Sequence, residues 1–402
     1  MMEQDKKQFD YLIIGGGMAA AHAAEGIREL DQSGSIGILS SDQDKPYTRP
    51  ALTKKLWTDE EFTVDDVVFD TIEKTNATLV LETVVSSIDK ENRTVTTENG
   101  TVYEYKSLLL ATGGEPQRID GPKDERVFAF RSLDDYRKLR ALAGPGKHAI
   151  VVGGSYIGTE LAANLKLNET DVTFVYPEEM LGGNRFPEEF AREYEDTYRE
   201  HGIKLISGTR AESYDIKDNQ LVVTLDNGET ISSDMLVLGL GVDPRLSLAE
   251  EAGLEVDDGV IADEFLRTSD KNLYAAGDIV SYPDPILGRN RIEHVDHARQ
   301  SGTAVGKIMA GSNEPYNYTP YFYSDVFDIS WKAIGTLDPE MDYFIDEVDG
   351  GKVAYFLEDN TPVGIITWNI EPDLDKVRDI LKNPPSSTEA LKGAIRDTED
   401  DE

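Results

Sequence analysis

The chain has 402 residues, which suits two or three domains and a core large enough to need no disulfide or metal for stability. It contains no cysteine, and this excludes disulfide frameworks, thiolate metal sites, iron–sulfur ligation and redox chemistry through a thiol pair. The net charge of −37 argues against nucleic acid or an anionic membrane as partner, because both require a basic surface.

No stretch approaches the roughly 18 consecutive apolar residues of a membrane span. Residues 1–10 are polar and contain neither an apolar signal region nor a transit peptide rich in Arg and Ser. We therefore predict a cytoplasmic protein. The excess of 77 acidic over 40 basic side chains leaves two explanations open, ordinary solubility and adaptation to a salt-rich cytoplasm.

Residues 11–20, YLIIGGGMAA, predict a buried strand, a glycine turn and the start of a helix. Gly15 permits a sharp turn, Gly17 lacks the Cβ that would obstruct a pyrophosphate, and Ala19 and Ala20 let the helix pack closely on the strand. This pattern is typical of a dinucleotide-binding turn. Glycine-rich turns also serve plain strand-to-helix packing, so the motif needs support from the rest of the chain.

The next strand is expected shortly before Asp42, the nearest acidic candidate for a ribose hydroxyl. Residues 46–57, PYTRPALTKKLW, then gather cations in a segment without clear periodicity. Arg49 could clamp a pyrophosphate, and Lys54 or Lys55 could place a positive charge near a cofactor ring. The alternative for each of these cations is an ordinary solvated position on the surface.

The order strand, glycine turn, helix, strand, hairpin, strand occurs twice in this chain. The first copy ends with a hairpin at 93–105 and an apolar strand at 108–114, LLLATGG. The second copy comprises a strand at 149–152, the turn GGSYIG at 153–158, a strand at 172–176, a hairpin at 221–231 and a strand at 235–241. Two copies predict two nucleotide-binding units, although a duplicated scaffold with one occupied site is an alternative. Two such sites without cysteine most simply move a hydride between two dinucleotides.

The second copy differs from the first in two informative ways. Ser155 takes the place of the middle glycine, where it either crowds a pyrophosphate or adds a hydroxyl to it. Glu178 and Glu179 follow the paired strand, with no basic residue before Arg185. A carboxylate there accepts hydrogen bonds from ribose and repels a 2′-phosphate, so NADH is preferred over NADPH, with solvated glutamates as the alternative reading.

Residues 272–278, NLYAAGD, form a short apolar run in which Gly277 permits a close backbone approach and Asp278 can accept a hydrogen bond from a polyol. Together with GGGMAA, ATGG and the second glycine turn, this motif resembles the flavoproteins with two dinucleotide-binding domains. In that family the late Gly-Asp pair contacts the ribityl and pyrophosphate region of FAD.

The closer resemblance is to apoptosis-inducing factor and the ferredoxin-reductase-like NADH:flavin oxidoreductases, and it spans nearly the whole chain. It is carried by PYTRPALTKKLW (46–57), FRSLDD (130–135), GGSYIGTELA (153–162), GRNRIEHVDHARQSG (288–302), AIGTLD (333–338) and VGIITWNI (363–370). The resemblance implies an α/β fold with two Rossmann-like domains, one for FAD and one for NAD(H), and a smaller C-terminal α/β domain. The implied boundaries are 1–121 and 245–318 for the FAD domain, 122–244 for the NAD(H) domain, 319–382 for the C-terminal domain and 383–402 for a mobile acidic tail.

The resemblance also implies the catalytic residues, which are Lys54, Glu160 and His294. Lys54 and Glu160 match a pair beside the isoalloxazine, where the cation stabilises charge that develops on the flavin and the carboxylate orients the cation. The alternative for this pair is an ordinary surface salt bridge. Glu293 and His294 match residues on the nicotinamide side of the flavin, and Tyr323 stands where the family has Trp, which leaves open how tightly oxidised NAD stacks.

The remaining implied contacts include two arginines, Arg49 at the FAD phosphates and Arg131 near the flavin. The full FAD side comprises Gly15, Gly17, Ala19, Ala20, Asp42, Arg49, Lys54, Ala111, Thr112, Gly113, Arg131, Gly277, Asp278, Glu293, His294 and Tyr323. The NAD(H) side comprises Gly153, Gly154, Ser155, Tyr156, Ile157, Glu160, Glu178 and Gly241. With five histidines and no cysteine, we expect no metal at His294 and His297.

These residues predict an enzyme that takes a hydride from NADH onto FAD and passes electrons to a small molecule or a small redox protein. A ferredoxin or rubredoxin reductase is one alternative, and an NADH-responsive redox-sensing interaction protein with slow turnover is another. A homodimer is left open. The mitochondrial presequence, the C-terminal insertion and the basic surface of animal apoptosis-inducing factors are not found in this sequence, so no apoptotic or DNA-binding role is expected.

Overall fold

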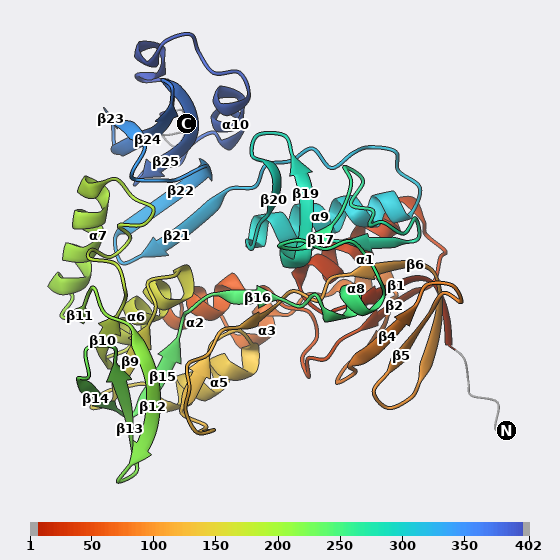
Figure 1. Ribbon diagram of the computed structural model, residues 1–402, viewed down its shortest axis with the longest axis horizontal. Helices are drawn as coiled ribbons and strands as arrows, with labels where there is room; N and C mark the ends of the chain where they lie inside the picture. The colour runs from red at the N-terminus through yellow and green to blue at the C-terminus, as the bar shows by residue number, and fades with distance from the viewer. Residues whose placement is uncertain (1–6, 397–402) are drawn as a thin grey trace. The chain divides into compact units, whose positions relative to one another are not determined.

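The computed structural model describes residues 7–396, and the chain divides into two compact units (Figure 1). Unit 1 takes in the described residues up to Arg49, then Thr63–Glu115 and Asp243–Pro320. Unit 2 takes in Pro50–Phe62, Pro116–Val242 and the described residues from Tyr321 onward. The chain passes between the units through β7 (Gly114–Pro116) and β16 (Val242–Pro244), which pair as a two-stranded sheet. The predicted α/β class is confirmed.

The centre of unit 1 is a parallel sheet built on the first copy of the repeat. Its order is β3 (Thr78–Val80), β2 (Ile36–Leu39), β1 (Lys7–Ile14) and β6 (Val102–Leu110), with β18 (Leu273–Ala275) paired to the end of β6. Ile14 pairs with both Leu39 and Leu110, so three strands end at the same level, directly before the glycine turn. The hairpin of β4 (Val85–Asp89) and β5 (Thr94–Thr97) adds antiparallel strands to the start of β6.

Two long helices of unit 1, α1 (Met18–Leu30) and α9 (Val295–Met309), lie against each other at unusually close range. A Cβ added to Gly302 would lie 2.5 Å from the Ala19 carbonyl oxygen, and one added to Gly306 would lie 2.1 Å from that of Ala23. Glycine is therefore required at both positions. Shorter elements complete the unit, namely α3 (Val64–Val67), α4 (Thr71–Thr75), α8 (Ser247–Glu251), η2 (Gly277–Ile279) and the sheet of β17 (Val260–Ile261), β19 (Val280–Asp284) and β20 (Gly288–Arg291).

Unit 2 repeats this architecture with the second copy. Its parallel sheet has the order β11 (Lys204–Ile206), β10 (Asp171–Val175), β9 (His148–Val152), β15 (Met235–Leu238) and β8 (Val127–Ala129). Val152 pairs with Val175 and Leu238, which reproduces the register around Ile14. The helices of this second copy are α5 (Leu133–Leu142), α6 (Tyr156–Leu167) and α7 (Glu188–Glu200). An antiparallel sheet is formed by β12 (Ala211–Lys217), β13 (Gln220–Leu225) and β14 (Thr230–Ser233).

The C-terminal part of unit 2 is an antiparallel sheet followed by α10 (Leu374–Lys382). The strand order is β21 (Phe322–Val326), β22 (Ile329–Gly335), β25 (Thr361–Trp368), β24 (Gly351–Glu358) and β23 (Asp342–Val348). Aromatic packing joins this sheet to α7, since the ring of Trp368 lies 4.8 Å from that of Phe190 and its Nε1 donates to Glu193 at 2.9 Å. The sheet therefore has a firm attachment to the second dinucleotide fold.

The stretch expected to form a mobile acidic tail begins at residue 383, and its described part contains a turn with buried side chains. The turn η3 (Thr388–Leu391) packs on the C-terminal sheet, and Leu391 and Ile395 are each 1% exposed. The Tyr355 hydroxyl donates to the Leu391 carbonyl at 3.1 Å. Two buried apolar side chains and this hydrogen bond hold the segment in place. Residues 397–402 of the predicted tail lie outside the described residues.

Residues 50–62 belong to unit 2, although they lie within the stretch predicted for the first domain. They form η1 (Pro50–Thr53) and α2 (Lys55–Thr58). Asn164 of α6 donates to the Thr53 carbonyl at 2.6 Å, and the Tyr136 hydroxyl of α5 donates to the Leu56 carbonyl at 2.9 Å. These backbone contacts fix the segment that carries Lys54.

Candidate active site

The glycine turn of unit 1 leaves open the space that a pyrophosphate requires. A Cβ on Gly15 would lie 2.1 Å from the Ala111 carbonyl oxygen, so only glycine fits between these strand ends. A Cβ on Gly17, in contrast, would meet nothing within 4 Å. Gly17 is the N-cap of α1, and no side chain among the described residues caps it. An uncapped helix N-terminus beside open space fits an anionic dinucleotide such as FAD.

Asp42, Tyr47 and Arg49 lie together after β2. The Tyr47 hydroxyl donates to Asp42 Oδ2 at 3.1 Å, and the Arg49 guanidinium lies 5.2 Å from the centre of the Tyr47 ring. The backbone N–H of Asp44 also donates to Asp42, at 3.1 Å. The Asp42 carboxylate is therefore held by its own loop, and Arg49 is placed near it by the aromatic ring.

The late Gly-Asp motif meets α1 and α9. Gly277 has φ 72°, its N–H donates to the Ser301 hydroxyl at 3.1 Å, and a Cβ added to it would lie 3.0 Å from the Ala19 Cβ. Asp278 follows in η2, and its carbonyl accepts a hydrogen bond at 3.2 Å from Arg291, which also pairs with Glu293. Gly277 therefore lies close to Ala19, in the first turn of the helix that follows the glycine turn.

His294 has a structural role in addition to its predicted one. It is the N-cap of α9, and its Nδ1 accepts a hydrogen bond from the Asp296 N–H at 3.3 Å. An imidazole that accepts through Nδ1 carries its proton on Nε2. Sequence reasoning did not find this cap, because histidine is not among the usual N-cap residues.

The other predicted FAD contacts of unit 1 follow β6. Ala111 supplies the carbonyl that faces Gly15. The Thr112 hydroxyl donates to the Arg245 carbonyl at 3.2 Å, and Gly113 has φ 63° with its carbonyl accepting from the Arg245 N–H at 3.0 Å. Arg131 and Tyr323, predicted for the same cofactor, belong to unit 2. Arg131 lies between β8 and α5, where its N–H donates to Asp135 at 3.0 Å.

In the glycine turn of unit 2, the Ser155 side chain is engaged by the turn itself. Its hydroxyl donates to the Gly239 carbonyl at 2.6 Å and accepts from the Gly158 N–H at 3.5 Å, so it caps α6. Gly153 matches Gly15, since a Cβ there would lie 2.4 Å from the Gly239 carbonyl oxygen. The Ser155 side chain points toward Gly239, and its hydroxyl satisfies backbone groups of the turn.

Glu178 lies beside this turn with one carboxylate oxygen unused. A Cβ on Gly154 would lie 3.1 Å from Glu178 Oε2, an atom that is buried and has no hydrogen-bond partner among the described residues. The other oxygen accepts from Asn184 at 3.2 Å. Arg185 donates to the Gly154 carbonyl at 2.5 Å. A buried, unsatisfied acceptor beside the turn fits a ribose diol, because such groups are costly unless a ligand satisfies them.

The remaining predicted NAD(H) contacts surround this turn. Tyr156 begins α6, and the Arg185 guanidinium lies 4.9 Å from the centre of its ring. Burial raises the pKa of the Tyr156 hydroxyl to about 12, so it stays protonated at neutral pH. Ile157 follows it and is half-buried. Gly241 has φ 98° and open space at its Cβ position, and its carbonyl accepts from the Gln117 N–H at 3.0 Å.

The predicted Lys54–Glu160 pair is present in unit 2. The Lys54 ammonium contacts Glu160 Oε1, and it lies 5.1 Å from the centre of the Tyr323 ring. The side chains of Lys54 and Glu160 are 16% and 6% exposed, so the pair is not a surface salt bridge. A partly buried cation held by a buried carboxylate and an aromatic face is suited to stabilising negative charge on a bound group.

Three partners of this pair were missed by the sequence analysis. Thr53 and Ser324 donate hydroxyl hydrogen bonds to the Glu160 carboxylate, and Asn164 donates to the carbonyls of Thr53 and Glu160. Thr53 lies inside the predicted motif and Ser324 directly follows Tyr323. Neither hydroxyl has a sequence signature of its own, because serine and threonine serve many local roles.

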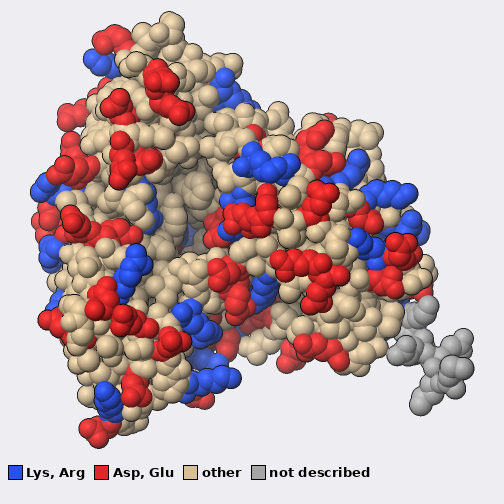
Figure 2. All heavy atoms as spheres, in the orientation of Figure 1, with Lys and Arg blue, Asp and Glu red and all other residues tan. Residues whose placement is uncertain are grey.

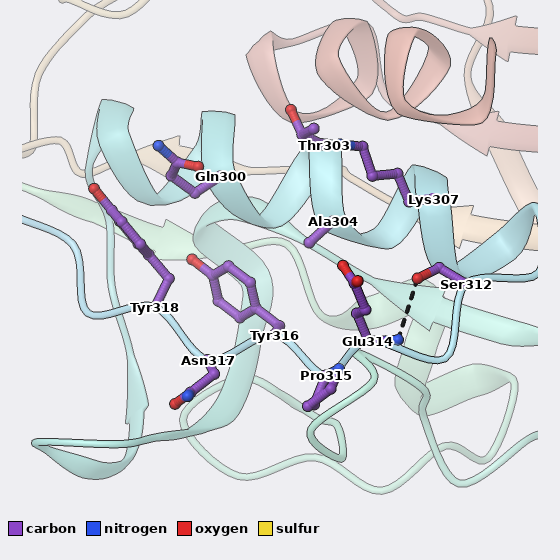
Figure 3. A pocket seen from close by; sticks show the side chains of 10 residues that line it. All are labelled: Gln300, Thr303, Ala304, Lys307, Ser312, Glu314, Pro315, Tyr316, Asn317 and Tyr318. Atoms are coloured by element: carbon purple, nitrogen blue, oxygen red, sulfur yellow. Dashed lines mark hydrogen bonds between the residues drawn. The ribbon is translucent and has the colours of Figure 1, made fainter. Parts of the chain in front are cut away.

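A pocket of about 270 Å³ lies beside α9 in unit 1 and contains none of the predicted site residues (Figure 3). Its lining is Gln300, Thr303, Ala304, Lys307, Ser312, Glu314, Pro315, Tyr316, Asn317 and Tyr318. The hydroxyl of Tyr316 lies 3.1 Å from Nδ1 of the fully buried His297. Burial lowers the pKa of His297 to about 4, so its imidazole is neutral at physiological pH. We assign these residues to packing behind α9.

The described surface carries charges of both signs. Figure 2 shows Asp and Glu over the visible surface of both units, with Lys and Arg interspersed among them. Within residues 7–396, no group of three or more His, Asp or Glu side chains is arranged to hold a metal ion. No helix in that range is long and apolar enough to cross a bilayer.

Comparison with known proteins agrees with this geometry. Residues 9–302 match the family described as pyridine nucleotide-disulphide oxidoreductase. A monodehydroascorbate reductase from Pisum sativum is 34% identical, covering 92% of each chain, and apoptosis-inducing factor 1 from Dictyostelium discoideum is 30% identical, covering 94% of this chain and 79% of that one. The ferredoxin reductase for the CYP199A2 system from Rhodopseudomonas palustris has a TM-score of 0.84 and 27% identity, over 93% of this chain and 94% of that chain.

The fold and the two dinucleotide turns therefore define an oxidoreductase of the two-dinucleotide class, which uses FAD and a pyridine nucleotide as predicted. The chain belongs to the pyridine nucleotide-disulphide oxidoreductase family. It differs from the family description in one respect, because a chain without cysteine cannot form the disulfide that the description names.

Proposed function

We propose that the protein is an NADH:acceptor oxidoreductase in which unit 1 is the FAD domain and unit 2 carries the NAD(H) domain. The observation that carries the proposal is the partly buried Lys54–Glu160 pair, which belongs to the same unit as the self-capped glycine turn. When bound, FAD accepts a hydride from reduced nicotinamide and donates electrons to an acceptor.

The residues that would hold FAD are those around the open turn of unit 1. The uncapped N-terminus of α1 and the Arg49 guanidinium favour the pyrophosphate, since both present hydrogen-bond donors to an anion. Asp278, whose backbone carbonyl accepts from Arg291, would accept from the ribityl chain through its carboxylate. His294 would lie on the nicotinamide side of the flavin, where its Nδ1 is engaged in capping α9.

The residues that would hold NAD(H) are those of the second turn. Glu178 Oε2 is ready to accept from the adenosine ribose, and its charge repels the 2′-phosphate of NADPH. Ser155 satisfies the turn without a ligand, which suits a nucleotide that exchanges in every cycle. Lys54 would face the charge that develops during hydride transfer, and Glu160 keeps the ammonium in position.

A small molecule is the acceptor that this chain favours. Without a thiol, electrons must leave at the flavin itself, and the monodehydroascorbate reductase from Pisum sativum is similar to this chain over 92% of both chains. A small redox protein is the second candidate, supported by the likeness to a ferredoxin reductase. The net charge of −37 would repel an acidic protein of that kind at low ionic strength. A cytoplasmic location is proposed with the same function.

The proposal is tested by anaerobic titration of the purified yellow protein with NADH, followed by a screen of acceptors. We expect bleaching of the flavin absorbance by one equivalent of NADH, slower bleaching by NADPH, and rapid recovery with a quinone or an organic radical. Bleaching that requires NADPH would contradict the assignment of Glu178. Slow turnover with every acceptor, accompanied by a change in oligomer size on reduction, would favour the redox-sensing alternative.

A further inference from the structure

Lys54 is one of three side chains that donate to the Glu160 carboxylate. Ser324 Oγ donates to Oε1 at 2.6 Å, the same oxygen that Lys54 contacts, and Thr53 Oγ1 donates to Oε2 at 2.5 Å. Glu160, Thr53 and Ser324 are 5%, 6% and 1% exposed. A single buried carboxylate therefore joins segments from η1, α6 and β21.

The two hydroxyls change what Lys54 can do. A buried carboxylate is stabilised in its ionised form by each hydrogen bond that it accepts, and here neutral donors satisfy part of that demand. Lys54 shares Oε1 with Ser324, so the ammonium is not the carboxylate's only source of stabilisation. Because the two hydroxyls satisfy part of the carboxylate charge, Glu160 offsets less of the positive charge of Lys54, and more of that charge acts on a bound group.

The hydroxyls also fix the position of the ammonium. Thr53 precedes Lys54 in the chain, and Ser324 follows Tyr323, whose ring centre lies 5.1 Å from the Lys54 ammonium. Asn164 holds the carbonyls of Thr53 and Glu160, at 2.6 and 3.0 Å. Thr53 is thus the chain neighbour of Lys54, and Ser324 is the chain neighbour of the aromatic ring beside the Lys54 ammonium.

We infer that Thr53 and Ser324 are positioning residues for Lys54 that act through Glu160. Through Ser324, the C-terminal sheet influences the electrostatic potential around bound FAD and thereby the midpoint potential of the flavin. This inference rests on the proposed function, since Lys54 is taken there to act on bound FAD. It assigns the C-terminal sheet a part in the redox chemistry in addition to its packing.

The test measures the midpoint potential of bound FAD and the rate of its reduction by NADH in a double-mutant cycle. Ser324→Ala and Thr53→Val are made in the natural chain and in Lys54→Met. In the natural chain we expect each to slow reduction about tenfold and to make the potential more negative, in line with a lost hydrogen bond to a charged group. In Lys54→Met neither should have a further effect. Ser324→Thr and Thr53→Ser should restore both quantities.

Thr367→Val is the matched control. Its hydroxyl lies in the same C-terminal sheet, is equally buried and donates to the Lys332 carbonyl at 3.3 Å, without contact to Glu160. We expect its potential to equal that of the natural chain. Thermal unfolding of each variant without FAD separates loss of the fold from loss of positioning, and Thr53→Val provides an independent test where Ser324→Ala is unstable.

The outcomes distinguish the inference from the function on which it rests. An impaired Lys54→Met beside an unaffected Ser324→Ala and Thr53→Val would overturn the inference alone. Equal effects of the hydroxyl variants in both backgrounds would also overturn it, because they would then act without Lys54. A Lys54→Met variant with the natural potential and rate would refute the proposed role of Lys54 and the inference together.

Discussion

The two glycine turns share one framework and differ in how their backbone groups are satisfied. Gly15 and Gly153 occupy the same place, each so close to a neighbouring strand that a Cβ would lie 2.1 or 2.4 Å from a carbonyl oxygen. At the middle position Gly17 leaves open space and an uncapped helix, whereas Ser155 caps α6 with its own hydroxyl. The first turn depends on a ligand to complete it, and the second is complete without one.

The helices that follow the two turns also differ at an equivalent position. The seventh residue after the first glycine is His22 in unit 1 and Glu160 in unit 2. Burial lowers the pKa of His22 to about 4, which leaves it neutral, while Glu160 is ionically paired with Lys54. One position on a duplicated helix has thus become part of the packing in one copy and part of the proposed chemistry in the other.

The largest effect is expected from Gly17→Val. Gly17 has φ −88° and space around it, so the fold should tolerate the side chain, but the methyl groups would occupy the place of the pyrophosphate. We expect FAD affinity to fall by at least about a hundredfold, the equivalent of two charge-assisted hydrogen bonds. Reconstitution of the FAD-free protein, followed by flavin fluorescence, measures this. Ser155→Val is the control and should keep its FAD; Gly17→Val purified fully yellow would contradict the comparison.

The next effect is expected from Lys54→Met. Removing a preorganised positive donor should slow flavin reduction by NADH about 10²- to 10³-fold, with FAD affinity little changed. Stopped-flow absorbance under anaerobic conditions measures the rate. Lys55→Met is the control, since its ammonium lies over the Phe62 ring at 5.6 Å and makes no contact with Glu160. Equal rates in the two variants would show that Lys54 is an ordinary cation.

A smaller effect is expected from Glu178→Gln, which keeps the shape of the side chain and removes its charge. The KM for NADH should rise about tenfold, and the preference over NADPH should relax, because the ribose loses a charged acceptor. Steady-state kinetics with both nucleotides measure the ratio. Glu179→Gln alters the exposed neighbouring glutamate and should leave the ratio unchanged. Similar changes in both variants would indicate a general effect of surface charge.

The smallest effect is expected from His22→Gln, and it concerns pH. The folded pKa of His22, about 4, lies below the 6.5 of an unfolded histidine, so the unfolded chain binds the proton first and stability falls as pH drops from about 6.5 to about 4. At pH 5 the loss due to His22 is at most about 2 kcal/mol. Urea unfolding at pH 7 and pH 5 should show a smaller loss for His22→Gln than for the natural chain. An identical loss of stability in the two proteins would show that a group other than His22 causes the pH dependence.

Much of the fold was readable because its signals are local. The glycine turns, the apolar strands and the hairpin turns depend on a few neighbouring residues, and the repeat reinforced each of them. The residues 50–62 were harder to place, because their assignment depends on contacts from Asn164 and Tyr136 that lie far away in the sequence. The polar composition around Leu391 gave no indication that Leu391 and Ile395 would be buried.

The candidate site was predictable to a different degree. The Lys54–Glu160 pair came from resemblance to a family, since no spacing rule connects two residues so far apart in the chain. Ser155 was recognised as unusual, but its hydroxyl could be assigned to Gly239 only once β15 was in place. The sequence carries no signal for the roles of Thr53, Ser324 and the His294 cap, because these roles depend on contacts that form only in the folded structure.

The membership of residues 50–62 in unit 2 has a consequence for how the chain can be divided. Because this short excursion carries Lys54 and is encoded inside the first copy of the repeat, a gene cut between the copies would separate the cation from Glu160. Neither half, expressed as its own polypeptide, would contain a complete hydride-handling centre. The duplicated halves have become mutually dependent, so later recombination could exchange them only as a whole.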